Sequence, residues 1–526
     1  MKKFISKTSI LAALAITLAS CQKNLDLQPK NDVTAEVVYK DINGYNQSVA
    51  KIYGSFALTG NSGPAGSGDV VGIDEGSTDF IRVMWKAQEL STDEAVIAWG
   101  DPGIQDFHNM NWDGNNIFMK GFYFKAEYQI TLINEFIRQS TDAKLAARGI
   151  TGADADLVKS YRTEVRFLRA FDYWALMDLY GNPPVTTEAD LIGSGLPKQL
   201  GRAKLFEFIE TELKAIETQL PAVKDAAHYG RATQGAVQAL LARMYLNAQV
   251  YTGTARYADA LIYSKKVIDS QKYSLTSNYR YLGLADNNTS PEFIWTVNYD
   301  GIKTQTYGGT TFLVHASLGG NMNEGDYGVD AKWGGIRTTS AFVNKFPDPS
   351  GNTDKRANFY SNGQSLEINS LTTFTDGYAV PKFQNKDQQG KNGNNATFVS
   401  SDFPVFRLAE MYLIYAEAQL RGGGGDVATA LGYINALRTR AYGNTSGNVT
   451  SINLDFIIDE RSRELYWEGH RRTDLIRFGK FVTSAYLWPW KGGVKAGKAV
   501  EDFRTVYPLP YDDVNANTNL VQNTGY

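Results

Sequence analysis

The stretch from residue 403 to 421, FPVFRLAEMYLIYAEAQLR, constrains the fold more than any other part of the chain. At about 100° per residue, a helix over this stretch would place its four charged side chains in one narrow stripe. Apolar side chains would cover most of the remaining circumference. We therefore expect a helix that is buried almost all round and needs helical neighbours on several sides. The four charged residues are Arg407, Glu410, Glu417 and Arg421.

A near copy of this stretch occurs earlier in the chain. Residues 408–413 read LAEMYL and residues 241–246 read LARMYL, and a second helical stretch follows each copy within about twenty residues. Repeated helix pairs of this kind are typical of tetratricopeptide-like arrays. We predict a mainly α fold with a large irregular insertion and a few short strands. The helix pairs are expected at about 35–56, 117–139, 156–270 and 403–481.

The amino terminus has the features of a lipoprotein signal. A basic start precedes an apolar run over residues 10–19 that is too short to span a bilayer. The following Leu18-Ala19-Ser20-Cys21 resembles the lipobox of bacterial lipoproteins, in which the cysteine becomes the first residue and is acylated with fatty acids such as palmitate. Cys21 is the only cysteine of the 526 residues, which favours a chemical role for it. We expect a signal peptide at 1–20, an acylated tether at 21–34 on a membrane surface, and a body at 35–526.

Composition excludes one class of partner and leaves another open. The net charge is −3, from 53 basic and 56 acidic side chains, so nucleic acid is not an expected partner. Aromatic residues make up 12% of the chain, including 30 tyrosines. Such residues can fill helix cores or form surfaces that stack and hydrogen-bond, and composition alone does not separate the two.

Two irregular regions, at about 57–116 and 296–400, are expected to hold a ligand site. The loop 99–116 places Trp99 and Trp112 among polar residues, where a role in the core is hard to explain. A Gly-, Asn- and Thr-rich insertion at 300–395 follows an expected strand at 291–299, and structureless insertions of this length are usually functional. The aromatic candidates of this second region are Tyr299, Tyr307 and Trp333. Packing onto the helices is the alternative role of each of these rings.

The sequence gives little support to catalysis. It contains no nucleophile elbow, no phosphate-binding Gly-Lys-Ser/Thr loop and no His-Glu-x-x-His motif. A glycoside hydrolase, which needs only two well-placed carboxylates, is the enzyme alternative. We expect a protein that is not an enzyme. The charged run at 460–477 is expected to be an ion-pair network that fixes the last helix to the repeats.

The sequence contains only part of one metal-binding motif. Residues 109–114, NMNWDG, begin like a calcium loop, but Lys120 stands where an EF-hand requires a glutamate. We expect no cofactor and no EF-hand. A structural calcium ion at another kind of site is the alternative that the sequence leaves open.

The carboxy-terminal part carries a recognisable pattern. Residues 460–465 read ERSREL, residues 467–472 read WEGHRR and residues 507–510 read YPLP. Together these segments resemble the signature of the SusD/RagB family of outer-membrane nutrient-binding lipoproteins, and the resemblance extends from the lipobox to the last residue. It implies a lipid-anchored protein of the outer membrane that faces the outside. It also implies a tetratricopeptide-type half that seats against a TonB-dependent, SusC-like porter, and an irregular half that carries the ligand site.

The amino-terminal third resembles the starch-binding members of this family. The segments GPAG at 63–66, DEG at 74–76 and TDEA at 92–95 carry this likeness. It implies a shallow arc of aromatic rings that matches the curve of an α-glucan, with Arg, Asp and Asn side chains on the sugar hydroxyls. The matching positions here are Asp74, Arg82, Trp99 and Asn109, although Arg82 could instead form ion pairs with the acids around it.

These observations combine into one expectation. The protein captures starch or maltooligosaccharides by aromatic stacking and delivers them to the porter; the same role with a different glycan is the alternative. The expected ligand-binding residues are Asp74, Arg82, Trp99, Asn109, Trp112, Tyr299, Tyr307 and Trp333.

Overall fold

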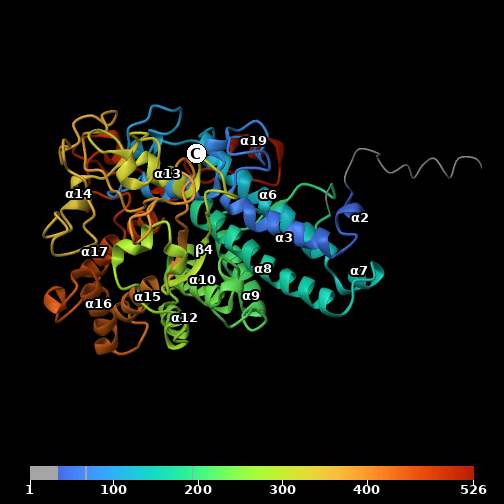
Figure 1. Ribbon diagram of the computed structural model, residues 1–526. Helices are drawn as coiled ribbons and strands as arrows, with labels where there is room; N and C mark the ends of the chain where they lie inside the picture. Colours follow the sequence, from blue (N-terminus) through green and yellow to red (C-terminus); the bar gives the residue numbers. More distant parts are fainter. Residues whose placement is uncertain (1–33, 66–67, 192) are drawn as a thin grey trace, which may run out of the picture.

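The computed structural model describes residues 34–526, with the exception of 66–67 and 192 (Figure 1). The predicted signal peptide, Cys21 and the tether up to residue 33 lie outside the described residues. Within the described part, none of the helices combines the length and the apolar character that crossing a bilayer requires. The structure is mainly helical with a few short strands, which confirms the predicted fold class.

Helix pairs build one half of the molecule. They are α10 (Gln234–Leu246), α12 (Tyr257–Asp269), α15 (Leu408–Leu420), α16 (Val427–Tyr442), α17 (Leu454–Leu465) and α18 (Arg471–Arg477). The first four of these pack in succession, α10 against α12, α12 against α15, and α15 against α16 (Figure 1). Leu241 of the LARMYL copy and Leu413 of the LAEMYL copy are both completely buried between these helices. The repeated segments therefore mark corresponding positions in a stack of helices.

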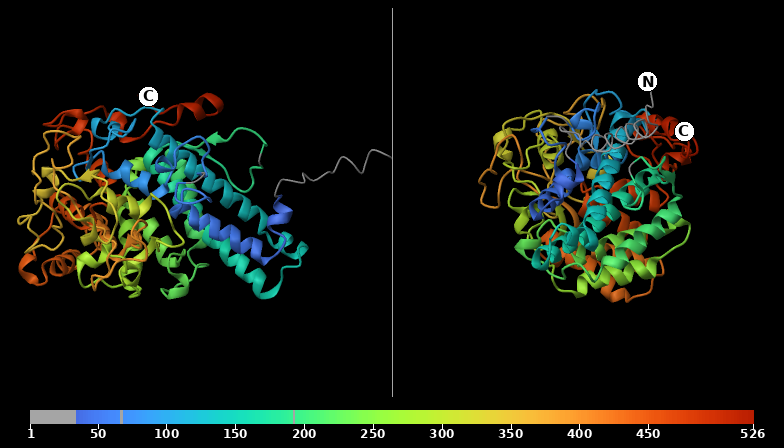
Figure 2. Two further views of the ribbon diagram at one scale, coloured as in Figure 1. Left: turned by 45° about the horizontal axis from the view of Figure 1, so that its top comes forward. Right: turned by 90° about the vertical axis from the view of Figure 1, so that its right-hand side faces the viewer.

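Four helices from the amino-terminal half of the chain continue this stack. They are α3 (Ile42–Ala57), α6 (Ile117–Gln139), α8 (Gly152–Tyr180) and α9 (Arg202–Ile216). In Figures 1 and 2, α3, α6 and α8 run side by side along the molecule, and the irregular segments cover the opposite half. Shorter helices join these parts: α2 (Ala35–Val38), α4 (Phe80–Glu89), α5 (Asp106–Asn109), α7 (Asp142–Ala147), α11 (Ala248–Thr252), α13 (Gly309–Ala316), α14 (Ser340–Val343) and α19 (Tyr511–Ala516).

The described residues form three antiparallel strand pairs, and two of them join segments that are distant in the sequence. They are β1 (Val96–Ile97) with β5 (Ile336–Arg337), β2 (Pro184–Val185) with β3 (Lys198–Gln199), and β4 (Phe293–Val297) with β6 (Phe403–Arg407). The last pair corrects the expectation that a helix starts at residue 403. Phe403–Arg407 is extended because it pairs with β4 in the register Phe293↔Arg407 and Val297↔Phe403. The helix begins only at Leu408.

The expected helix over 454–481 is also interrupted. The chain leaves the helical conformation after Leu465 and turns through Trp467 (φ 63°) and Gly469 (φ 79°) before α18 begins. The completely buried Trp467 side chain fixes this turn, because its Nε1 donates to the carbonyl oxygen of Glu94 at 3.1 Å. Contact with the amino-terminal third thus ends a helix that local periodicity would continue.

The charged run at 460–477 is a buried ion-pair network, as predicted. Arg407 sits at its centre and contacts Glu292, Glu464 and Glu468 at 2.7–2.8 Å. All four side chains are buried. Burial alone would raise the pKa of a glutamate, but in Glu460 the guanidinium groups around it bring the pKa down to about 2. These groups tie β4, β6 and α17 together and have no opening towards solvent.

Candidate functional site

The start of α4 is tied to the large insertion through one buried carboxylate. Asp79 caps α4, and its Oδ1 accepts hydrogen bonds from the backbone N–H groups of Arg82 at 2.8 Å and of Gly309 at 3.0 Å. Burial raises the pKa of this carboxyl, although both N–H groups stabilise its charged form. The first turn of α4 and the start of α13 are therefore held at a fixed separation.

Arg82, on that first turn, reaches from α4 to the insertion. Its Nη1 donates to the carbonyl oxygen of Tyr307 at 3.0 Å, and its guanidinium lies 4.7 Å from the ring centre of Phe312 and 5.7 Å from that of Trp99. Asp74 lies nearby, because a Cβ placed on Gly76 would meet both the Asp74 carboxylate and the Arg82 guanidinium. The structure thus brings Asp74 and Arg82 to one place beside two aromatic rings.

The pairing of β1 with β5 brings two tryptophans together. Trp99 follows β1 and Trp333 precedes β5, so antiparallel pairing places them at the same end of the ladder. The backbone N–H of Ala98 donates to the oxygen of Gly335 at 2.8 Å, and Trp99 Nε1 donates to the oxygen of Trp333 at 3.1 Å. A Cβ on Gly335 would come within 2.7 Å of the Trp99 ring. Trp99 can occupy its position only because residue 335 is a glycine.

Trp99, Trp333 and Tyr307 form a row of rings that we name the aromatic platform. The ring centres of Trp99 and Trp333 are 6.4 Å apart, and those of Trp333 and Tyr307 are 6.2 Å apart. All three residues are half-buried, so each retains some solvent-exposed surface. The buried Phe398 continues the row 5.4 Å beyond Tyr307. A row of partly exposed rings can cover the apolar faces of successive pyranose units.

His315 of α13 supports the middle ring from behind. Its ring stacks on Trp333 at 4.7 Å with an interplanar angle of 19°. The two ring nitrogens lie 2.8 Å from the oxygen of Ala331 and 2.9 Å from that of Thr397. Burial lowers the pKa of this imidazole. Stacking and these two polar contacts hold the His315 ring in a fixed position against Trp333.

Two expected ligand residues prove to be core residues. Trp112 is completely buried, packs its ring on Tyr507 at 4.6 Å and donates from Nε1 to the hydroxyl of Tyr526 at 2.7 Å, so the prediction that it stacks on a ligand is wrong. Tyr299 is 3% exposed, and its ring lies directly against Gly309, so it too is unavailable for stacking. Trp112 is covered by the carboxy-terminal end of the chain, whereas Tyr299 is covered by the nearby start of α13.

Asn109 lies apart from the other candidates. It is half-buried at the end of α5, where its side chain packs against Gly493. Of the eight expected residues, the structure thus gathers five: Asp74, Arg82, Trp99, Tyr307 and Trp333. Ligand contact by these five stays a prediction.

Sequence reasoning missed Phe398 and Phe312. Phe398 extends the platform, and Phe312 lies beneath the Arg82 guanidinium. Phe312 has a detectable signal, because the apolar stretch GTTFLVHA is a short buried helix inside the insertion. In the described part of the chain, no group of three or more His, Cys, Asp or Glu side chains is arranged to hold a metal ion.

Comparison with known proteins decides the family. The chain is 34% identical to the starch-binding protein SusD of Bacteroides thetaiotaomicron over an alignment that covers 100% of this chain and 99% of the relative. It belongs to the SusD family. The SusD family model matches residues 348–526, which include the ERSREL, WEGHRR and YPLP segments. A SusD-like protein of Formosa agariphila, P25, is 24% identical over 69% of this chain and 72% of its own length.

Solved structures of SusD-like proteins have the same fold. A laminarin-binding SusD-like protein matches with a TM-score of 0.70 and 21% identity over 92% of this chain and 99% of its own. Surface glycan-binding protein A of Bacteroides thetaiotaomicron, in complex with laminarihexaose, matches with a TM-score of 0.68 and 22% identity over 91% of this chain and 99% of its own. At this level of identity the likeness establishes the SusD-like architecture of the chain.

Proposed function

We propose that the protein binds starch or maltooligosaccharides on the aromatic platform and delivers them to a TonB-dependent, SusC-like porter. The aromatic platform carries this proposal. Its three rings offer stacking surfaces, and Arg82 and Asp74 stand beside them as a planar donor and an acceptor for sugar hydroxyls. The full-length similarity to a starch-binding protein supports an α-glucan as the ligand.

Stacking on the platform predicts weak binding of short glycans. Stacking removes roughly 80 Å² of apolar surface per ring from water, which contributes about 2 kcal/mol per contact before the cost of ordering the ligand. A few such contacts give an affinity in the range of about 1 mM to about 1 μM for a short oligosaccharide. A polysaccharide that presents many such segments binds more tightly through its multivalency. Capture of polymers at a surface fits this pattern of affinity.

The anchor and the location belong to the same proposal. Acylation of Cys21 would attach the protein to the outer membrane, with the body facing the outside, where polysaccharides are present. The stacked helix pairs offer a rigid surface for the porter on the half of the molecule that does not carry the platform. A structural calcium ion is not required by this proposal.

The second candidate is the same role with another glycan, such as the β-glucan laminarin. A SusD-like protein of the same fold binds laminarin, and a surface glycan-binding protein of this fold is solved with laminarihexaose. A row of three rings does not by itself specify a linkage. Calorimetry of the chain from residue 22 onward against maltoheptaose, a cyclic α-glucan and laminarihexaose separates the two candidates.

The expected result is heat with both α-glucans, none with laminarihexaose and no new reducing ends afterwards. Heat with laminarihexaose alone would replace the α-glucan by a β-glucan. New reducing ends would contradict binding without cleavage and revive the glycoside hydrolase.

A further inference from the structure

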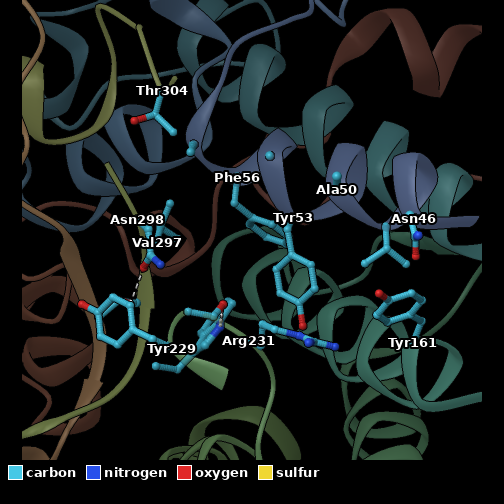
Figure 3. Close-up of a pocket in the computed structure, with 16 residues that line it drawn as sticks. Asn46, Ala50, Tyr53, Phe56, Tyr161, Tyr229, Arg231, Val297, Asn298 and Thr304 are labelled. Carbon is cyan, nitrogen blue, oxygen red and sulfur yellow. Dashed lines mark hydrogen bonds between the residues drawn. The ribbon is translucent and has the colours of Figure 1, made fainter. Parts of the chain in front are cut away.

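A second concave site lies away from the aromatic platform, between α3, α8, β4 and the turn at residues 229–231 (Figure 3). Its volume is about 410 Å³, which falls within the range of roughly 300–1,000 Å³ that small-molecule pockets occupy. We name it the α3 pocket. Tyr53, Tyr161 and Tyr229 supply aromatic walls, and all three are half-buried. In Figure 3, Tyr53 extends from α3 towards Arg231, and Tyr229 faces them from the other side.

The only cation in the lining of the pocket, among the described residues, is neutralised within the protein. Arg231 forms a two-point ion pair with the buried Glu164, in which its Nε lies 3.0 Å from the carboxylate. Tyr53 donates to the same carboxylate at 2.7 Å. The Arg231 guanidinium also lies 5.4 Å from the ring centre of Tyr161. A pocket whose charge is already balanced favours a neutral ligand over an anion.

Polar groups with unused hydrogen-bonding capacity are present beside the rings. Asn298 uses its side-chain oxygen to accept from the Thr296 hydroxyl at 2.6 Å, and within the described residues its Nδ2 has no acceptor. The exposed Asn46 offers a complete side-chain amide on the opposite wall. Tyrosine faces combined with amide donors and acceptors suit a polyhydroxylated ring, which has apolar C–H faces and a polar rim.

Gly54 indicates that space is kept for a ligand. It lies in the interior of α3, where glycine costs the helix about 0.5–1 kcal/mol relative to alanine. Packing does not require it, because a Cβ at this position would meet no heavy atom within 4 Å. Gly54 lines the pocket. The residue therefore widens the pocket at the expense of the stability of its helix.

The pocket continues beyond Asn298 into a second hollow of about 330 Å³. The two share Tyr229, Asn298 and Thr304, and the second adds Asn288 and Asn394. Its two carboxylates are engaged within the protein. Asp402 accepts from the Tyr229 hydroxyl at 2.6 Å, and Asp300 accepts from the backbone N–H groups of the turn at 302–304. The combined groove is polar, and its two carboxylates already accept hydrogen bonds from the protein.

We propose that the α3 pocket is a second saccharide-binding site, which takes a neutral mono- or disaccharide unit independently of the aromatic platform. The choice of a sugar as the ligand rests on the proposed function. The location of the site rests on the pocket itself. The segment between β4 and α13 contributes to both sites, because Thr304 lines the pocket and Tyr307 belongs to the platform. A long glucan could therefore contact the protein at two places.

Two indole groups report separately on the two sites. Trp99 Nε1 donates to Trp333 on the platform, whereas Trp295 Nε1 donates to the oxygen of Gly230, which lines the pocket, at 3.1 Å. The experiment is a titration of ¹⁵N-indole-labelled protein, residues 22–526, with maltose, followed by NMR. The expected result is that both indole signals move in the wild-type protein, with different concentration dependences.

Substitutions at Gly54 test the location. Gly54→Leu fills the pocket and should abolish the movement of the Trp295 signal while that of Trp99 remains. Gly432→Leu in α16 is the matched control, because a Cβ there also meets no heavy atom within 4 Å and the residue lies outside the pocket, and it should retain both movements. A Trp295 signal that stays still in the wild-type protein, or moves equally in Gly54→Leu, overturns the proposal. Movement of Trp295 with a stationary Trp99 would support this site and contradict the platform instead.

Discussion

At the scale of single residues, the platform depends on a position that carries no side chain. Gly335 leaves room for the Trp99 ring beside the β1–β5 ladder, and Trp99 Nε1 donates to the backbone oxygen of Trp333. Gln105 also fixes the backbone of Trp99, because its Nε2 donates to the Trp99 carbonyl oxygen at 2.6 Å. The orientation of the Trp99 ring is thus set by its neighbours.

Replacing Gly335 with alanine should displace the Trp99 ring, since the new methyl group would come within 2.7 Å of it. We expect maltoheptaose affinity, measured by calorimetry, to fall about tenfold, which corresponds to about 1.4 kcal/mol, while the far-UV spectrum stays unchanged. Gly432→Ala in α16 is the matched control, because a Cβ there meets nothing within 4 Å. Unchanged affinity in Gly335→Ala would mean that the position of Trp99 is not critical.

Asp402 illustrates how a buried carboxyl makes stability depend on pH. Burial and the charge of Asp300 raise its pKa to about 7, although the Tyr229 hydroxyl and the backbone N–H of Tyr299 both donate to it. The folded protein therefore holds this proton more tightly than the unfolded chain, where the pKa is 3.8. The contribution to stability is present below the unfolded pKa and is lost as the pH rises through 7.

Asp402→Asn removes this proton while keeping an acceptor for Tyr299. From about pH 5 to about pH 8, the wild-type protein should lose about 2–3 kcal/mol more of its free energy of unfolding than the variant loses. Urea denaturation at the two pH values measures this difference. Parallel pH profiles for the two proteins would show that the Asp402 carboxyl is already charged at neutral pH.

Sequence could identify some of these residues and not others. Trp99 and Trp333 stand out because they are large rings in irregular, polar segments. Trp112 has the same local setting, but Tyr507 and Tyr526 cover it from the far end of the chain. Burial by segments about four hundred residues away leaves no local signal. Phe398 was not predicted either, because its contact with Tyr307 joins two distant parts of the insertion.

At the scale of secondary structure, local periodicity predicted helices well where no distant partner intervened. The helix expected from about Ile117 to Gln139 has those bounds, with Asn116 as its cap. The errors occur where tertiary contacts decide. Phe403–Arg407 is as apolar as a buried helix, yet pairing with β4 makes it a strand, and Trp467 ends α17 by docking against the oxygen of Glu94.

The ion-pair network provides a prediction at this scale. Arg407 connects β6 with α17 and the following turn through Glu464 and Glu468. Arg407→Met would leave buried carboxylates without their cation, so we expect a loss of about 3–5 kcal/mol in the free energy of unfolding by urea. Lys204→Met, in an exposed pair with Glu207, should change it by less than about 0.5 kcal/mol. Equal effects of the two substitutions would contradict a structural role for the buried network.

At the scale of the whole molecule, the stacked helices and the aromatic platform lie in different halves. Stacked helix pairs form one half, and the irregular segments that carry the platform cover the other half (Figure 2). The rings come from the loop after β1 and from the insertion before β5 and α13, so a site of three rings is assembled from two distant regions on a rigid base. This arrangement suits a protein that holds a polymer by shape and stacking.

The most direct test compares two tryptophans of the same loop by calorimetry with maltoheptaose. Trp99→Ala should lose about 2 kcal/mol of binding free energy, or about thirtyfold in affinity, because it removes one stacking surface. Trp112→Phe should bind like the wild-type protein, because the ring it replaces is completely buried. Loss of binding in Trp99→Ala alone is the result that the platform predicts. Retained affinity in Trp99→Ala, with the protein folded, would contradict glycan recognition at the platform.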